Sequence, residues 1–541
     1  MTKKLDKDYH KKAVGYQIYP KSFKDSNADG IGDLQGIIEK LPYLKSLGID
    51  FIWLNPIYAS PQVDGGYDIS DFYDIDPMFG TMADFKALLA KCHQLGMKLI
   101  MDLVVNHTSN QHKWFIEAQK SKDNPYRDYY LWADASPEKK PNNWRSFFGI
   151  SAWTYQEQTQ QAYFHIFAAE QPDLNWKNPK LRAEIYKMVR WWLEDIGIDG
   201  FRLDAISHIQ KMDWDFELRS FDGDDPWEPF MNVIGIDNYL TDLKKIFNEF
   251  DATTVGEASG VRSNKGAADW TDADEGYLDA IFELEHNRKK SDGTGDLYEY
   301  KKVIMRWQGD LLERGWNALY IENHDMPRAI SIFGDGSLAS AKALAVQYML
   351  LRGTPFIYYG QEIGMSSYPF ESIDEISSED TRNHYFNALK SGVPEKEAFF
   401  KEVLNSRDGA RTPMQWNREK NAGFTEGQPW MPINPNYTTV NVEDSSELIA
   451  LYRELISLRH HEKSLQDGGI RFHFPRSKAI FCYEREDFLV LVNLSDQKLS
   501  RKMTAIPIED YQQVLGSRPI KKIPRTLSLS GWEYHVFKRK S

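Results

Sequence analysis

Short apolar strands that alternate with helical segments constrain this sequence more than any other feature. Strand-like runs occupy residues 14–23, 49–56 and 98–107, and amphipathic helical runs at 34–48 and 84–96 lie between them. Strands that are apolar on both faces and separated by helices pair side by side in parallel sheets. The first hundred residues therefore predict the α/β class with a parallel sheet.

The alternation stops after the third strand and later resumes. Residues 108–173 are rich in Asn, Trp, Ser and Gln with little periodicity, and so long a segment is more typical of an inserted subdomain than of a loop. A helical run at 179–197 and a strand-like run at 198–206 follow. The remaining strand-like runs are residues 252–258, 280–286, 317–325 and 355–362. Eight strands in all predict a closed (β/α)₈ TIM barrel.

Beyond residue 460 the pattern changes to short alternating strands with turns and no helix between them. These runs are residues 469–475, 479–485, 488–494 and 531–539. They predict a separate antiparallel domain of β-sandwich-like form. The expected organisation is a barrel from residues 1–107 and 174–459, a subdomain inserted after strand three at 108–173, and a C-terminal domain at 460–541.

Composition narrows the partners and the compartment. Acidic side chains outnumber basic ones, 79 to 66, for a net charge of −13, so we expect no nucleic-acid partner. The two cysteines, Cys92 and Cys482, fit a reducing compartment. Neither an apolar signal segment nor a run of about 18 apolar residues occurs, so we expect a cytoplasmic protein without a membrane partner. Monomer and homodimer both stay open.

Polar residues gather where the predicted barrel strands end. They are Asn106 and His107 after strand three, Arg202 and Asp204 on strand four, Glu257 on strand five, and His324 and Asp325 on strand seven. A single strand-end Asp is equally well explained as a helix cap or a salt bridge, but three carboxylates beside an arginine are not. Paired carboxylates, one ionised and one protonated, are the equipment of glycoside hydrolysis.

Four motifs carry a resemblance to a known family. "DLVVNH", "GFRLDAISH", "VGEAS" and "ENHD" resemble, in this order, the four signature regions of the α-amylase family of glycoside hydrolases. "QPDLN" and "SRDGARTPMQW" further resemble its oligo-1,6-glucosidase branch. The resemblance implies a retaining mechanism with Asp204 as nucleophile, Glu257 as general acid/base and Asp325 as the third carboxylate. Retention predicts that the carboxyl groups of Asp204 and Glu257 lie roughly 5–5.5 Å apart.

The resemblance also implies the residues that bind the sugar. Arg202 would keep the nucleophile ionised, and Tyr67 would stack on the glucose. An ion pair between Asp64 and Arg407 would close the pocket beyond one sugar, which makes the enzyme exo-acting. The other expected contacts are His107 and His324 to hydroxyls, Arg411 near the leaving sugar, and Phe167 lining the pocket from the inserted subdomain, although Phe167 fits an ordinary buried aromatic equally well.

Ala205, directly after the nucleophile, bears on the linkage that is cleaved. In this branch Val at that position tends to accompany α-1,6 cleavage, whereas Ala or Thr tends to accompany α-1,4 cleavage. We therefore predict an α-glucosidase acting on maltose and short malto-oligosaccharides. The sequence does not decide whether it also transfers glucose to another sugar. The alternative explanation of Ala205 is that it only suits core packing. The alternatives are an oligo-1,6-glucosidase or dextran glucosidase, and a trehalose-6-phosphate hydrolase. A sucrose isomerase or a non-catalytic transporter-associated subunit is less favoured.

The stretch "KDSNADGIGD" places oxygen-bearing residues at alternate positions, as a hard cation requires. It is no EF-hand, because the twelfth position is Gly36 instead of Glu. A solvated acidic turn is the alternative. The branch has a cation loop of this form, so the resemblance implies structural Ca²⁺, or Mg²⁺, and no organic cofactor. The implied ligands are Asp25, Asn27, Asp29, the Ile31 carbonyl and Asp33.

Overall fold

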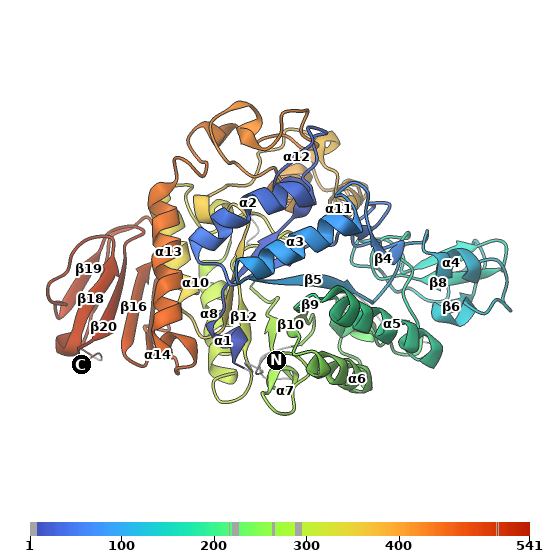
Figure 1. The fold of residues 1–541 in the computed structure, drawn as a ribbon, viewed down its shortest axis with the longest axis horizontal. Helices are drawn as coiled ribbons and strands as arrows, with labels where there is room; N and C mark the ends of the chain where they lie inside the picture. The colour runs from blue at the N-terminus through green and yellow to red at the C-terminus, as the bar shows by residue number, and fades with distance from the viewer. Residues whose placement is uncertain are drawn as a thin grey trace.

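Eight parallel strands close into a barrel with helices around it, as the sequence predicts (Figure 1). The computed structural model describes residues 8–215, 217–218, 227–261, 266–286, 295–504, 506 and 508–540. The strands pair in the order β1-β13-β12-β11-β10-β9-β5-β2. Their bounds are β1 Gly15–Ile18, β2 Phe51–Leu54, β5 Lys98–Val104, β9 Gly200–Asp204, β10 Thr253–Glu257, β11 Ala280–Phe282, β12 Asn317–Leu319 and β13 Thr354–Tyr358.

The helices begin and end where local chemistry favours it. The Asp33 carboxylate caps α2 by accepting a hydrogen bond from the Gly36 amide, and Gly48, with φ of 101°, ends that helix. A reciprocal pair of hydrogen bonds between Thr81 and Asp84 caps α3. The helices between the barrel strands are α2 Leu34–Leu47, α3 Met82–Gln94, α5 Pro179–Trp191, α6 Ile236–Glu249, α7 Ala267–Thr271, α8 Leu297–Asp310, α9 Ala329–Ile332 and α10 Leu338–Met349, with the short α1 Tyr9–Lys12 before β1.

The seventh barrel strand is shorter than predicted. β12 ends at Leu319, so His324 and Asp325 lie in a loop beyond it. The Asn323 side chain accepts a hydrogen bond from the Asp325 amide, and the Glu322 carboxylate accepts one from the Ala329 amide. These local bonds replace ladder pairing and turn the chain over the end of the barrel.

The inserted segment forms a small subdomain to one side of the barrel (Figure 1). Its antiparallel sheet has the order β6-β8-β7. Backbone bonds from Leu174 to Asn106 and from Thr108 to Pro172 fasten both ends of the insert to the strand-three edge. Its elements are α4 Lys113–Ala118, β6 Trp132–Asp134, β7 Trp153–Gln156 and β8 Gln161–Phe164, and a separate pair, β3 Tyr58–Ala59 and β4 Asp71–Ile75, precedes it.

The C-terminal domain is built from two antiparallel sheets with an apolar core between them. The predicted boundary at residues 459–460 falls inside α13 (Ser446–His461), and the first strand of the domain starts only at Arg471. No helix in the described part of the chain is long and apolar enough to cross a membrane. The elements are β14 Arg471–His473, β15 Ile480–Arg485, β16 Phe488–Asn493, β18 Tyr511–Gly516 and β20 Tyr534–Arg539 in one sheet, and β17 Leu499–Lys502 and β19 Thr526–Leu529 in the other; α11 Glu379–Lys390, α12 Glu395–Ala398 and α14 Lys463–Gln466 complete the chain.

Candidate active site

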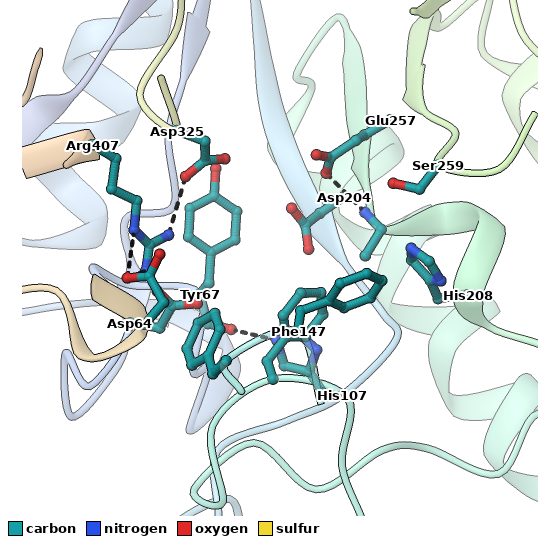
Figure 2. Close-up of a pocket in the computed structure, with 14 residues that line it drawn as sticks. Asp64, Tyr67, His107, Phe147, Asp204, His208, Glu257, Ser259, Asp325 and Arg407 are labelled. Atoms are coloured by element: carbon teal, nitrogen blue, oxygen red, sulfur yellow. Dashed lines mark hydrogen bonds and ion pairs between the residues drawn. The ribbon is translucent and has the colours of Figure 1, made fainter. Parts of the chain in front are cut away.

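A cavity of about 240 Å³ lies where the carboxyl ends of the barrel strands meet (Figure 2). Asp204, Glu257 and Asp325 all face it, from β9, β10 and the loop after β12. Parallel pairing of β9 with β10 places the first two at the same edge of the sheet. The lining residues are Asp64, Tyr67, His107, Phe147, Phe148, Phe167, Asp204, Ala205, His208, Glu257, Ser259, Asp325, Asp380 and Arg407.

The guanidinium of Arg202 binds the carboxylates of both Asp204 and Glu257. Its Nη1 donates to Asp204 Oδ1 at 2.5 Å, and its Nη2 donates to Glu257 Oε2 at 2.8 Å. The Ala205 amide donates to the same Glu257 oxygen at 3.2 Å. Because Arg202 is only 2% exposed, these bonds form away from bulk water and fix the two side chains. The predicted carboxyl separation itself stays a prediction.

Asp102 is a third partner of Arg202, and it was not predicted from the sequence. Its Oδ1 accepts from Arg202 Nη1 at 2.6 Å, and its Oδ2 accepts from the Trp53 indole at 2.8 Å. The residue is fully buried within β5. The available signal was an Asp inside an otherwise apolar strand, "LIMDLVV", because a buried carboxylate requires a partner.

Burial sets the charge of this cluster. Burial raises the pKa of Asp102 to about 6 and raises the pKa of Asp204 well above its usual range, while Arg202 opposes both shifts. The single positive charge of Arg202 neutralises the charge of only one of the three carboxylates that bind it. For Asp204 burial is the larger effect, so the expectation that Arg202 keeps this carboxylate ionised stays a prediction.

An ion pair lines one end of the cavity. Arg407 Nη2 donates to Asp64 Oδ1 at 2.9 Å, which is the pairing that the resemblance implies. Arg407 Nη1 also donates to Asp325 Oδ1 at 3.1 Å. Gln171, outside the predicted set, donates to Asp64 Oδ2 at 3.2 Å. Figure 2 shows Asp64, Arg407 and Asp325 on the side of the cavity away from Glu257.

Asp325 is held ionised by cations. Burial raises the pKa of Asp325, but His324, Arg407 and Arg411 outweigh burial and hold the pKa far below its usual range. Burial lowers the pKa of His324 itself to about 3, so this imidazole is neutral at neutral pH and the two arginines carry the effect. Arg411 lowers the pKa of Asp325 from a position outside the cavity, because neither Arg411 nor His324 is among the residues that line the cavity.

The expectation that Arg411 lies near the leaving sugar is therefore not supported by its position. Its Nε donates to the His324 carbonyl at 2.7 Å, and its Nη2 donates to Asp325 Oδ1 at 2.9 Å. The side chain is 4% exposed. These two bonds commit the guanidinium to the loop that carries Asp325, so it orients that loop and does not project into the cavity.

Tyr67 and His107 lie side by side on the cavity wall. The Tyr67 ring stacks on His324, with centroids 5.4 Å apart, and its hydroxyl bonds to His324 Nε2 at 2.7 Å. His107 Nε2 lies 3.1 Å from the Tyr67 carbonyl oxygen. Burial lowers the pKa of His107 to about 3, which leaves a neutral ring suited to hydrogen bonding with hydroxyl groups.

The inserted subdomain supplies an aromatic wall. Phe167 lines the cavity and stacks on Phe147, with centroids 5.5 Å apart. Phe148 lines the same wall, and the Arg407 guanidinium lies 5.5 Å from its ring centroid. Of these three rings only Phe167 was predicted to line the pocket, because adjacent aromatics in a segment without periodicity give no sign of which ones reach a site.

The proposed cation loop forms a hydrogen-bonded turn. Asp25 accepts from the amides of Asn27, Ala28 and Gly30 at 2.8 Å, and Asp33 Oδ1 accepts from the Gly36 amide at 2.7 Å. Within the described ranges, no group of three or more His, Cys, Asp or Glu side chains is arranged around a metal position. Asp25 Oδ1 accepts from two amides, and Asp25 Oδ2 accepts from the Gly30 amide and the Thr425 hydroxyl, so a cation would have to replace some of these bonds. The oxygen donors are of the type that calcium prefers, and the cation site stays a prediction.

A parallel barrel whose strand ends bring paired carboxylates to a small cavity defines a class of enzyme, the glycoside hydrolases. Comparison with protein families agrees, because the family "Alpha amylase, catalytic domain" matches residues 17–468. The chain belongs to the alpha-amylase family.

Individual relatives cover almost the whole chain. The oligo-1,6-glucosidase of Parageobacillus thermoglucosidasius is 44% identical over 574 residues, 99% of this chain and 99% of the relative. The trehalulose synthase of Pseudomonas mesoacidophila MX-45 has a TM-score of 0.93 at 38% identity, over 98% of this chain and 99% of its own. A mutant trehalose-6-phosphate hydrolase of Bacillus licheniformis has a TM-score of 0.92 at 38% identity, over 98% and 100%. The family match and the oligo-1,6-glucosidase relative identify the chain as a glycoside hydrolase of the alpha-amylase family.

Proposed function

We propose that the enzyme is a retaining, exo-acting α-glucosidase that releases glucose from the non-reducing end of short α-gluco-oligosaccharides. The ion pair between Asp64 and Arg407 is the observation that supports this proposal, because it lies on the side of the cavity away from Glu257, where it would block a longer sugar chain. In this proposal Asp204 attacks the anomeric carbon, and Glu257 protonates the leaving oxygen and then activates water.

For the linkage we propose α-1,6, in place of the α-1,4 preference that Ala205 favours. The support is the name of the relative with 44% identity, an oligo-1,6-glucosidase. Ala205 lines the cavity, but a difference of one small side chain moves discrimination by only about 1–3 kcal/mol. Contacts from other residues of the cavity wall can therefore outweigh the contribution of Ala205 to linkage preference.

The linkage proposal predicts faster glucose release from isomaltose than from maltose, by roughly tenfold or more in kcat/KM. Purified enzyme is assayed for glucose on both disaccharides at equal concentration, with Asp204→Asn as the inactive control. A preference for maltose would restore the Ala205 interpretation and overturn the α-1,6 proposal. That result would leave the proposal of exo-acting cleavage unchanged.

A trehalose-6-phosphate hydrolase is the second candidate, because one such enzyme shares the fold over the whole chain. To bind a phosphate on the leaving sugar, the enzyme would need Lys or Arg side chains on the open side of the cavity. Among the described residues that line the cavity, the only Lys or Arg is Arg407, and it lies on the side away from Glu257. The unphosphorylated substrate is therefore favoured.

We also propose that the loop with Asp25, Asn27, Asp29, the Ile31 carbonyl and Asp33 binds Ca²⁺, with Mg²⁺ as a weaker substitute. Removing the ion with a chelator should lower the midpoint of thermal unfolding by a few degrees, since a ligand at about 100 times its Kd stabilises by roughly 2.7 kcal/mol. Added Ca²⁺ should restore it. Asp29 is exposed, so Asp29→Ala should abolish the response without loss of folding. An unchanged midpoint in the wild type would contradict the site.

A further inference from the structure

Arg407 contacts three carboxylates that come from three separate parts of the chain. Asp64 precedes β4, Asp325 follows β12, and Asp380 lies in the first turn of α11. Asp380 Oδ1 accepts from Arg407 Nε at 3.1 Å and contacts Nη2 at 3.0 Å. All three nitrogens of the guanidinium are therefore engaged. Asp380 also lines the cavity.

The first turn of α11 is fastened to the turn that carries Arg407. The Asp408 carboxylate accepts hydrogen bonds from the amides of Ser377 and Ser378, at 2.7 and 2.9 Å. The hydroxyls of Thr381 and Ser406 lie 3.1 Å apart. Asp408 is fully buried, so these bonds are shielded from water. The two segments form one hydrogen-bonded unit that presents both Asp380 and Arg407.

Asp64 and Asp325 come from the barrel side, and they meet Arg407 through different nitrogens. Asp64 binds Nη2, and Asp325 binds Nη1. A side chain as long as arginine reaches both positions at once only in a narrow set of rotamers. The hydrogen bond from Arg407 Nε to Asp380 fixes the orientation of the guanidinium plane. In that orientation Nη1 faces Asp325 and Nη2 faces Asp64.

We propose that Asp380 is a positioning residue for the one-sugar pocket, acting through Arg407. The proposal rests on the exo-acting α-glucosidase function. Asp380 holds the guanidinium so that Asp64 and Asp325 keep the orientation in which they receive glucose hydroxyls. The reacting carboxylates depend instead on Arg202, on the other side of the cavity. Loss of Asp380 therefore weakens sugar binding much more than it slows bond cleavage.

The test uses 4-nitrophenyl α-D-glucoside, whose leaving group carries no sugar hydroxyls, and glucose as a competitive inhibitor. Asp380→Ala should raise KM and the glucose Ki by about tenfold and change kcat by less than about threefold. Asp380→Asn keeps the shape and one acceptor oxygen, so its effect should be smaller. Glu379→Gln, one residue earlier on α11 and outside the cavity lining, is the matched control and should match the wild type.

A double variant separates positioning from a general structural role. In an Arg407→Ala background, Asp380→Ala should add less than twofold to KM, because the residue through which it acts is gone. Unchanged KM and Ki in Asp380→Ala would overturn the proposal. The proposal would also fail if Asp380→Ala raised KM by the same factor in the Arg407→Ala background as in the wild type. A wild-type enzyme that releases glucose from no α-glucoside would instead refute the proposed function, so the two failures are distinguishable.

Discussion

Asp204→Asn should reduce glucose release by roughly 10⁴-fold or more, the scale seen when a nucleophile is removed. The amide keeps the size of the carboxylate but cannot form a glycosyl ester. Asp204 touches Arg202 at 2.5 Å and faces the cavity, so no neighbouring side chain of the cluster replaces it without moving. Steady-state hydrolysis of 4-nitrophenyl α-D-glucoside measures the loss.

Asp102→Asn is the matched control for this variant. Asp102 also binds Arg202 but is fully buried and does not line the cavity. If the loss in Asp204→Asn came only from disturbing Arg202, both variants would lose activity equally. We expect Asp102→Asn to retain at least tenfold more activity, with thermal unfolding of each variant measured alongside. Residual activity above about 1% in Asp204→Asn would refute its role as nucleophile.

Glu257→Gln should lower kcat/KM on isomaltose by about 10²–10⁴-fold, the contribution expected of a positioned acid and base. The side chain keeps its place because Arg202 and the Ala205 amide both bind Oε2, and an amide oxygen accepts the same bonds. The size of the loss should depend on the leaving group. Substrates whose leaving group departs without a proton need less help, so kinetics on α-glucosyl fluoride should be far less impaired.

Azide distinguishes a lost base from a damaged site. Azide attacks the glycosyl-enzyme without a base, so it should accelerate turnover of Glu257→Gln on α-glucosyl fluoride and yield α-glucosyl azide. Asp204→Asn, which forms no such intermediate by this route, should not respond. Equal losses on isomaltose and α-glucosyl fluoride, together with no azide effect, would contradict the assignment of Glu257.

The barrel and its strand-end residues were predictable because parallel strands impose a strong local pattern. Apolar runs broken by helices specify the sheet, and the carboxyl ends of parallel strands meet at one edge, so Asp204 and Glu257 had to lie near each other. The position of Arg202 followed from the same strand. The Asp64–Arg407 contact was expected only from the family resemblance, since 343 residues separate the pair.

Other parts of the site depend on tertiary contacts that leave no periodic trace. Asp380 reaches the cavity because Asp408 binds the start of α11, a contact between two segments without a strand pattern. Phe147 belongs to the inserted subdomain, whose sequence shows little periodicity. Arg411 carries the same charge as Arg407 four residues away, and only the bond to the His324 carbonyl shows that it faces the loop and not the cavity.

The central claim is that Asp204 becomes covalently bound to glucose during the reaction. The most direct measurement is to trap this intermediate with 5-fluoro-α-D-glucosyl fluoride, digest the protein and locate the added mass by tandem mass spectrometry. We predict a single fluoroglucosyl group on the peptide that contains Asp204, formed in the wild type and missing in Asp204→Asn. A label on another residue, or inactivation without any covalent label, would contradict the account.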